Sequence, residues 1–255
     1  MALELITVAC LTDNYAYLLH DADSGQTALV DAPEAAPILA ALAQRRWKLS
    51  DIFLTHHHDD HIQAVPELVA ATGARVTGGA SDAHRLPKLD HQIRPGDTLR
   101  VGAEEGQVLD VSGHTVGHLA FHFPASKLAF TADSLMAMGC GRLFEGTPAQ
   151  MWESLSRLAD LPPDTLICSG HEYTASNARF AATLEPDNPV LMSRVAAIAA
   201  ARDAGRATVP SLLSDELATN PFLRAGRSAL KAAIGKPDAT DAESFAELRA
   251  RKDKF

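Results

Sequence analysis

Residues 55–61 have the sequence Thr-His-His-His-Asp-Asp-His, which places four of the chain's 11 histidines within six positions. Imidazole and carboxylate groups together are typical ligands of zinc, iron or manganese. If this segment is extended, alternate side chains share a face, so His56, His58 and Asp60 can converge on one ion. His61 begins the turn into a helix and can point back toward the same place. The segment therefore predicts a metal site with four candidate ligands.

Three further candidates follow later apolar runs, at positions where strands are expected to end. His114 lies in Ser-Gly-His-Thr-Val-Gly-His, Asp133 ends Leu-Ala-Phe-Thr-Ala-Asp, and His171 lies in Ser-Gly-His-Glu-Tyr-Thr. A structural zinc takes about four protein ligands and a catalytic zinc only about three. Seven candidates exceed what one ion can use, so the sequence predicts two ions. Asp133 is the natural bridge, because a carboxylate has two oxygens to share.

Several residues near these motifs are open to a structural as well as a functional interpretation. Burying so many histidines and aspartates without a metal would be costly, which favours the metal interpretation for the cluster. His118, four residues past His114, could support a ligand, but a structural role is favoured. Asp31 could hydrogen-bond a ligand histidine or occupy a turn at the end of a strand. His57 and Asp59 are expected to point away from the ions.

The elements that must hold these residues are short in the first two thirds of the chain. Apolar runs bounded by Gly, Asp and Pro predict strands at 5–10, 15–19, 27–31, 51–55, 97–101, 107–112, 118–123, 127–132 and 166–170. Helices are expected at 33–46, at about 62–72, and from Thr147, which forms a capping box with Gln150. The metal candidates then lie in loops just past strand ends, where α/β folds place their active sites.

After His171 the composition changes to alanine-rich segments separated by prolines. Helices are expected there at 174–185, 190–204, 226–234 and 242–253. The sequence therefore predicts two domains, one over residues 1–171 and a helical one over residues 172–255.

Composition and charge exclude several classes of protein. Hydrophobic residues make up 46% of the 255 residues, which is ordinary for a globular chain and too high for a disordered one. The net charge of −9 argues against nucleic acid as a partner. No apolar run approaches the roughly 18–20 residues of a membrane span, and the N-terminus lacks the basic region of a signal peptide. Three cysteines without Cys-x-x-Cys spacing fit a reducing compartment, so we expect a cytoplasmic protein.

The motif Thr-His-x-His-x-Asp-His, followed by Gly-His-Thr, Ala-Asp and Gly-His, resembles the metallo-β-lactamase superfamily. Within it, the chain closely resembles the glyoxalase II family, also called hydroxyacylglutathione hydrolases. The resemblance covers nearly the whole chain, and its more specific motifs lie at 139–147, 169–174 and 249–255. It implies an α/β fold, an αββα sandwich with the metal site at one edge, and a C-terminal α-helical domain that binds substrate.

The resemblance also implies a role for each candidate residue. Two divalent metal ions are expected, with zinc first and iron or manganese as alternatives. Asp60 and Asp133 would act in catalysis through a metal-bound bridging hydroxide. The implied ligands are His56, His58 and His114 on one metal, Asp60, His61 and His171 on the other, and Asp133 between them. The implied substrate contacts are Arg142, Phe144, Tyr173, Arg249 and Lys252, although the family often has Lys and Tyr where Arg142 and Phe144 stand.

The reaction that the resemblance implies is hydrolysis of S-lactoylglutathione, or another S-2-hydroxyacylglutathione, to D-lactate or the matching 2-hydroxy acid and glutathione. This is the second step of methylglyoxal detoxification, and a monomer with this thioester as its partner is expected. Two alternatives stay open, a glutathione persulfide dioxygenase of the same superfamily with one iron, and a non-catalytic metal-binding module. All seven ligands are present, which favours two metals. Without the resemblance, Arg249 and Lys252 would fit a solvated helix end.

Overall fold

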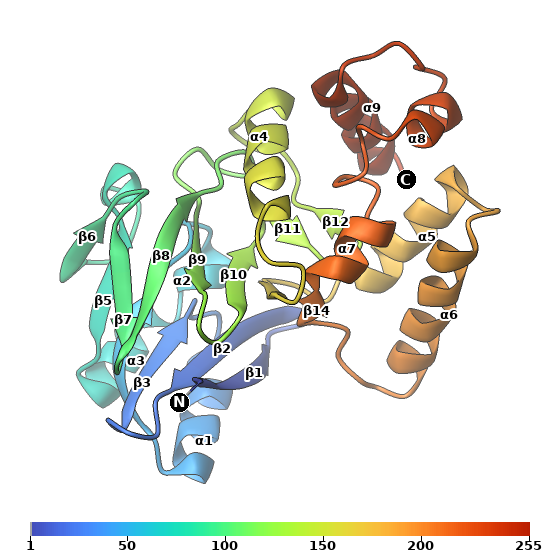
Figure 1. The fold of residues 1–255 in the computed structure, drawn as a ribbon. Helices are drawn as coiled ribbons and strands as arrows, with labels where there is room; N and C mark the ends of the chain where they lie inside the picture. The colour runs from blue at the N-terminus through green and yellow to red at the C-terminus, as the bar shows by residue number, and fades with distance from the viewer. Residues whose placement is uncertain (1) are drawn as a thin grey trace. The chain divides into compact units, whose positions relative to one another are not determined.

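The computed structural model describes residues 2–255, which form two compact units (Figure 1). The first unit comprises the chain up to Asp110 together with Gly117–Thr131. The second comprises Val111–Val116 and Ala132–Phe255. The two units therefore alternate along the chain instead of following one another.

A six-stranded mixed sheet forms the first part of the chain. Its strands lie in the order β1 (Glu4–Cys10), β2 (Asn14–His20), β3 (Gln26–Val30), β4 (Lys48–Phe53), β5 (Arg75–Gly79) and β6 (His91–Ile93). The pairs β1–β2 and β2–β3 are antiparallel, whereas β3 to β6 are parallel. Because parallel strands end at the same edge of a sheet, the segments that follow β3, β4 and β5 meet there. The amide of Asp31 accordingly bonds to Phe53 O, and that of Leu54 to Thr77 O.

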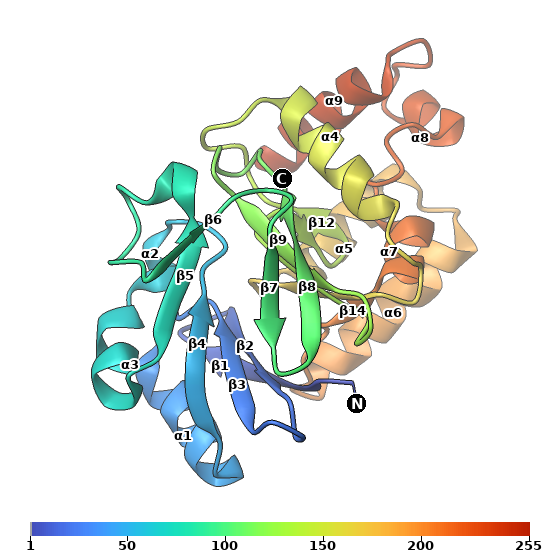
Figure 2. The same ribbon diagram turned by 60° about the vertical axis from the view of Figure 1, so that its left-hand side comes forward.

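Two helices cover this sheet with apolar faces. α1 (Ala35–Arg45) and α3 (Val65–Thr72) contact each other, and both contribute to one core with strands β1 to β5 (Figure 2). α3 ends at Gly73, whose φ of 71° is the left-handed conformation that glycine adopts without strain. The short α2 (Asp59–Ile62) and a 3-10 turn (Ala80–Asp82) complete the connections. The fully buried core side chains include Leu18, Leu29, Ile38, Ile52, Leu54 and Leu68.

A second six-stranded sheet has the order β14 (Ser211–Leu212), β13 (Leu166–Ser169), β10 (Leu128–Ala132), β9 (Leu119–Phe123), β8 (Glu104–Asp110) and β7 (Thr98–Val101). Every residue of β9 and β10 is buried, so both faces of these strands are covered. Within the first unit, Tyr17 of β2 contacts Phe130 of β10, and Phe53 of β4 contacts Phe121 of β9. Rings from the two sheets therefore interlock, as the predicted αββα sandwich requires, and this part of the fold prediction is confirmed.

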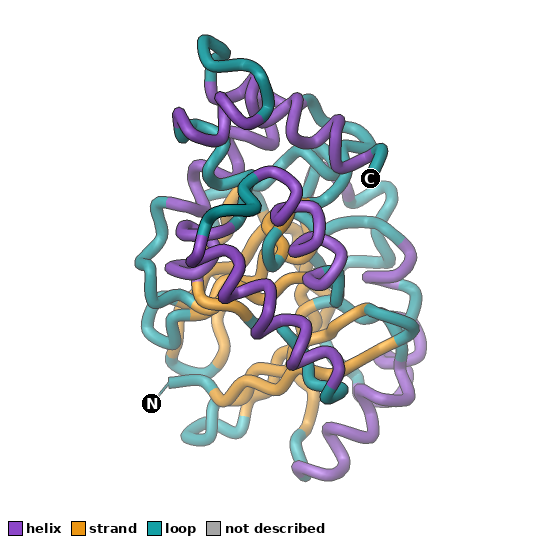
Figure 3. The backbone as a smooth tube through the Cα atoms, turned by 90° about the vertical axis from the view of Figure 1, so that its right-hand side faces the viewer, coloured by secondary structure: helices purple, strands orange, loops and turns teal. Residues whose placement is uncertain are grey.

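The second unit is mainly helical, and Figure 3 shows the C-terminus just past the last of its helices. It contains the hairpin β11 (Leu135–Met136) and β12 (Gly139–Cys140), and the helices α4 (Pro148–Ala159), α5 (Thr174–Leu184), α6 (Pro189–Asp203), α7 (Leu213–Thr219), α8 (Ser228–Ala233) and α9 (Asp241–Asp253). The predicted capping box of Thr147 and Gln150 starts α4. The helical C-terminal region is therefore confirmed, while the boundary at residue 172 stays a prediction. None of the helices in residues 2–255 has the length and hydropathy needed to span a membrane.

A buried carboxylate fastens the hairpin β11–β12 to α7. Glu216 is fully buried and accepts hydrogen bonds from Met138 N at 2.8 Å, from Ser211 Oγ at 2.8 Å and from Arg194. Asn220, just past α7, donates to the carbonyl oxygens of Met136 and Gly139 at 3.1 and 3.0 Å. The hairpin is therefore held through its main-chain atoms. These buried polar groups satisfy one another, which is what their removal from water requires.

Candidate metal centre

The segment after β4 carries the clustered histidines, and its conformation differs in part from the expectation. It has no regular structure from Leu54 to His58, whose backbone is extended with φ −65° and ψ 141°. α2 begins at Asp59, three residues before the expected start near residue 62. Side chains therefore alternate between two faces, as in an extended chain, only up to His58. A helical turn, and not an extended segment, positions Asp60.

Asp31 at the end of β3 is the anchor of this segment. Its Oδ1 accepts a hydrogen bond from Thr55 N at 2.9 Å, and its Oδ2 accepts one from Thr55 Oγ1 at 2.8 Å. The same Oδ2 lies 2.8 Å from Nδ1 of His61, and both side chains are buried. Asp31 has a φ of 58°, which Asp tolerates better than most residues. Of the two interpretations of Asp31, the structure shows the contact with His61, a candidate ligand histidine.

The same network selects the ligand atoms of two histidines. With Asp31 accepting from Nδ1, His61 presents the lone pair of Nε2. Thr55 Oγ1 donates to Asp31 and lies 3.0 Å from Nδ1 of His56, so it can accept from that nitrogen. Both rings therefore direct Nε2 as the ligand atom, because the partner of one ring nitrogen sets the role of the other.

The other acidic residues of the segment have separate surroundings. Asn14 at the start of β2 donates from Nδ2 to Oδ2 of Asp60 and to its carbonyl oxygen, both at 3.0 Å. Asp59 is exposed, as expected for a side chain that points away from the ions. His57 lies 3.4 Å from the buried carboxylate of Asp82, through Nδ1. Sequence reasoning missed Asn14 and Asp82, which lie far from the motif along the chain.

His118 is fully buried, and its ring stacks on that of His56 at 4.6 Å and 13°. Its Nδ1 lies 3.1 Å from the carbonyl oxygen of Leu119. His118 therefore has a packing role, as predicted, and the residue that it packs against is the candidate ligand His56.

Three candidates of the second unit lie at strand ends. Gly170 N, after β13, donates to the carbonyl oxygen of Ala132 at the end of β10, so these two ends are neighbours. The residues that follow them, His171 and Asp133, come together, with Nε2 at 3.3 Å from Oδ2. Nε2 of His114 lies 3.4 Å from the same Oδ2, while Nδ1 of His114 lies 2.7 Å from Arg142 O.

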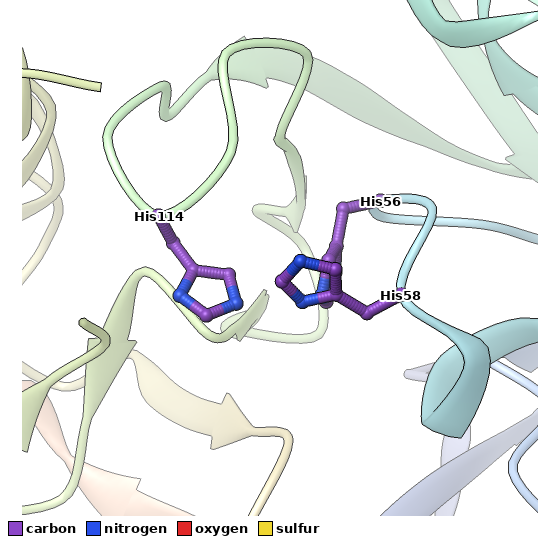
Figure 4. Close-up of side chains that lie close together, drawn as sticks. All are labelled: His56, His58 and His114. Atoms are coloured by element: carbon purple, nitrogen blue, oxygen red, sulfur yellow. The ribbon is translucent and has the colours of Figure 1, made fainter. Parts of the chain in front are cut away.

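These spacings fit ligands around a metal ion. Ligand atoms about 2.0–2.1 Å from a tetrahedral zinc lie about 3.3 Å from one another, and Oδ2 of Asp133 has this distance to two imidazoles. Candidate ligand atoms lie within 4.8 Å of one another in three sets: His56, His58 and His114 (Figure 4); Asp60, His61 and His171; and Asp31, His56 and His61. The first two sets contain residues that the resemblance assigns to separate ions, and this assignment stays a prediction. Both oxygens of Asp31 already accept hydrogen bonds from Thr55 and His61, so Asp31 orients a candidate ligand and is not itself a ligand.

Two of the predicted substrate residues flank candidate ligand histidines. The ring of Tyr173 stacks on His171 at 4.6 Å and 7°, and it is 40% exposed. Phe144 contacts His114 edge-on at 5.2 Å and is 63% exposed. Large apolar rings left in water at such positions can contact a ligand. Glu172, between His171 and Tyr173, accepts a hydrogen bond from Thr208 N at 2.9 Å and so holds this strand end in place.

The remaining predicted substrate residues form a group of cations. Arg142 is exposed, and its Nε lies 3.9 Å from Asp253 Oδ1. Arg249 is only 5% exposed and donates from Nη1 to Cys140 O at 2.9 Å, so a solvated helix end does not describe it. Lys252 donates to Ser176 O at 3.2 Å and Oγ at 3.0 Å. Partial burial, together with Arg249, Arg179 and Arg142, lowers the pKa of Lys252 to about 8.

The cysteines are not candidate nucleophiles. All three are buried free thiols. Burial raises the pKa of Cys10 to about 12 and that of Cys140 to about 11, so neither forms a thiolate at neutral pH. Neither of these thiols is therefore available as a nucleophile.

The anchor role of Asp31 gives a first prediction. Asp31→Asn keeps the shape and tolerates the backbone conformation, but one amide oxygen replaces two carboxylate oxygens that receive three contacts. We expect zinc affinity to fall by about 10–100-fold, the usual effect of losing such a partner. Competition with a chelator measures it. Asp51→Asn is the control, because Asp51 is a β4 carboxylate paired with Arg75. Equal losses in both variants would contradict the anchor role.

Known families match both parts of the sequence. The family model for the metallo-beta-lactamase superfamily matches residues 12–171, and the one for the hydroxyacylglutathione hydrolase C-terminus matches residues 172–255. A hydroxyacylglutathione hydrolase of Cereibacter sphaeroides is 69% identical over the whole length of both chains. One of Ruegeria pomeroyi is 60% identical, again over the whole length of both.

Solved structures are similar at lower identity. The crystal structure of ETHE1 from Myxococcus xanthus has a TM-score of 0.67 and 26% identity, and the match covers 99% of this chain and 98% of that one. TTHA1623 in a di-iron-bound form has a TM-score of 0.57 and 28% identity, covering 66% of this chain and 91% of that one. The full-length relatives are much closer in sequence than either. The chain therefore belongs to the hydroxyacylglutathione hydrolase family, within the metallo-β-lactamase superfamily.

Proposed function

We propose that this chain hydrolyses S-2-hydroxyacylglutathione thioesters, with S-lactoylglutathione as the main substrate, at a centre of two divalent metal ions. The proposed ligands are His56, His58 and His114 for one ion, Asp60, His61 and His171 for the other, and Asp133 for both. The observation that carries the proposal is the coincidence of this donor set with full-length relatives that are named for the same reaction. A similar chain in a di-iron-bound form supports two ions.

The bound ions would lower the pKa of water to about 7, and so supply hydroxide at neutral pH. The protein holds the ligands in the state that binds a cation. Asp31 and Thr55 fix the tautomers of His61 and His56, and Arg142 O does the same for His114. Asn14 orients the carboxylate of Asp60. The leaving group needs no strong acid, because an ordinary thiol has a pKa of about 8.5.

The substrate would be held through its glutathione part. Glutathione carries two carboxylates, which the cations Arg142, Arg249 and Lys252 suit. Tyr173 and Phe144 lie beside the ligands His171 and His114, and would contact the substrate near the thioester. Phe144 has no hydroxyl and gives apolar contact only.

The alternative with a specific observation in its favour is persulfide oxidation, since ETHE1 from Myxococcus xanthus has a similar structure. That reading leaves Asp60, His61 and His171 without a use, although their ligand atoms form one set. Product analysis separates the two reactions. Purified protein given S-lactoylglutathione should release lactate, and protein given glutathione persulfide with oxygen should release no sulfite. Sulfite without lactate would overturn the proposal.

Metal content gives the second prediction. Wild-type protein should bind about two ions per chain, and His171→Ala should lower this number to about one, because it removes a ligand of one ion only. Elemental analysis after dialysis measures it. His122→Ala is a matched control, because His122 is also buried but lies within β9, outside the three ligand sets. One metal per chain in fully active wild-type protein would contradict the binuclear proposal.

Zinc is the ion that we propose, with iron or manganese as alternatives that the donor set also accepts. We further propose a monomer in the cytoplasm. The three free cysteines support a reducing compartment.

A further inference from the structure

The last residue of α9 places a carboxylate among the cations of the second unit. Nε and Nη2 of Arg249 reach Asp253 Oδ1 at 3.1 and 2.9 Å. Nε of Arg142 lies 3.9 Å from the same oxygen. One oxygen of Asp253 therefore lies between two guanidinium groups, and their positive charges favour a carboxylate at this place.

All three nitrogens of Arg249 have acceptors within the protein. Nη1 donates to Cys140 O, and Nε and Nη2 donate to Asp253. The guanidinium also lies 5.1 Å from the ring of Phe222, which restricts its movement. Nε and Nη2 form the edge of the guanidinium that faces Asp253, so a substrate carboxylate that binds this edge with both oxygens must take the place of Asp253 or share its donors.

Helix stability does not account for an aspartate at this position. The C-terminal end of a helix carries a partial negative charge and favours cations. The order of the pair, with Arg249 four residues before Asp253, is also the less favourable one for an ion pair on a helix. Glu247 and Arg251, on the same helix, have the favourable order. The side chain of Asp253 is 43% exposed, so it can turn into solvent.

We infer that Asp253 is an internal competitor for the substrate carboxylate, which occupies the binding position at Arg142 and Arg249 until substrate displaces it. This inference rests on the proposed function, because it takes these cations as the glutathione subsite. The displaced Asp253 turns outward, and the substrate carboxylate takes over its contacts. Asp253 thereby sets an upper limit on affinity for glutathione thioesters, and it favours release of the product glutathione.

The test compares Asp253→Asn with wild type in steady-state kinetics on S-lactoylglutathione. Measurements at pH 6.5 and low ionic strength keep Lys252, with its pKa of about 8, charged. We expect KM to fall about two- to fivefold, the weight of an exposed ion pair, while kcat holds. A thioester esterified at its glycine carboxylate should show no difference between the two proteins. Asp253→Glu, which keeps the charge, should retain most of the wild-type KM.

Glu247→Gln is the matched control, because it removes the same charge from the same helix and also breaks a pair with an arginine. An unchanged or raised KM in Asp253→Asn would overturn the inference, as would an equal fall in Glu247→Gln. Calorimetry with glutathione gives a readout that does not need turnover. Tighter glutathione binding in Asp253→Asn without thioester hydrolysis in wild type would sustain the inference and refute the proposed function.

Discussion

Asp133→Ala should lower kcat/KM by more than about 100-fold and reduce metal occupancy at both sites. Partners that only support a ligand contribute about 10–100-fold, and Oδ2 of Asp133 lies 3.3–3.4 Å from two candidate ligands. Loss of a shared carboxylate also removes the negative charge that offsets the repulsion between two cations. Elemental analysis and thioester hydrolysis, run on the same preparation, measure the two effects.

Asp59→Ala is the control for this variant. Asp59 belongs to the ligand motif by position, but it is exposed in the first turn of α2. We expect its activity and metal content to stay near those of wild type, since surface substitutions usually change little. Similar losses in the two variants would show that the whole motif, and not the residues that face the ions, controls binding.

Lys252→Ala should raise KM for S-lactoylglutathione about tenfold or more, without a change in metal content. A hydrogen bond to a charged group is worth about 1.5–3 kcal/mol, and about 1.4 kcal/mol corresponds to a factor of ten. The change is made at Lys252 alone, because Arg249 is buried against Cys140 and its loss would also disturb the fold. A thioester without glutathione carboxylates should be hydrolysed equally by both proteins. An unchanged KM would limit Lys252 to fastening α9 through Ser176.

The pH profile provides a second reading of Lys252. Its pKa of about 8 lies below the ordinary 10.5, so the charge in the free enzyme is lost as pH rises through 8. In wild type kcat/KM should therefore fall above pH 8, and Lys252→Ala should lack this fall. Stability changes in the opposite sense. The unfolded chain binds more protons than the folded one between pH 8 and 10.5, so this group makes folding more favourable as pH rises through that window.

The fold was predictable where a strand or helix has a regular apolar pattern and a clear end. β5 was missed because it ends in Gly78 and Gly79, which suggest a loop. Both glycines allow close packing, since a Cβ at Gly78 would lie 2.9 Å from Leu86 Cδ1, and one at Gly79 would lie 3.3 Å from Leu119 Cδ1. α7 was missed because seven residues give too little periodicity to identify a helix.

The candidate ligands were predictable because histidine and aspartate at strand ends stand out in the sequence. The residues that support these ligands could not be predicted, because their partners are distant in the sequence. Asn14 and Asp60 are 46 residues apart, and Asp31 and Thr55 are 24 residues apart. No local pattern records such pairs. The burial of Arg249 could not be predicted from the sequence either. Both interpretations, a substrate contact and a solvated helix end, placed this residue in water.

The hydrogen bonds from Glu216 and Asn220 to the hairpin β11–β12 affect the design of chimaeras that transfer the substrate-binding tail from one relative to another. They join residues on both sides of position 172, so exchanging the tail alone would separate Glu216 from Met138 and Asn220 from Gly139. All of these hairpin contacts are to main-chain atoms. The side chain of Met138, however, is buried against Ala178 and Leu191 of the tail, so a transplanted tail would also have to fit the residue at position 138 of the host hairpin. The hairpin and the tail therefore form one unit of exchange, and a chimaera should be joined before residue 135.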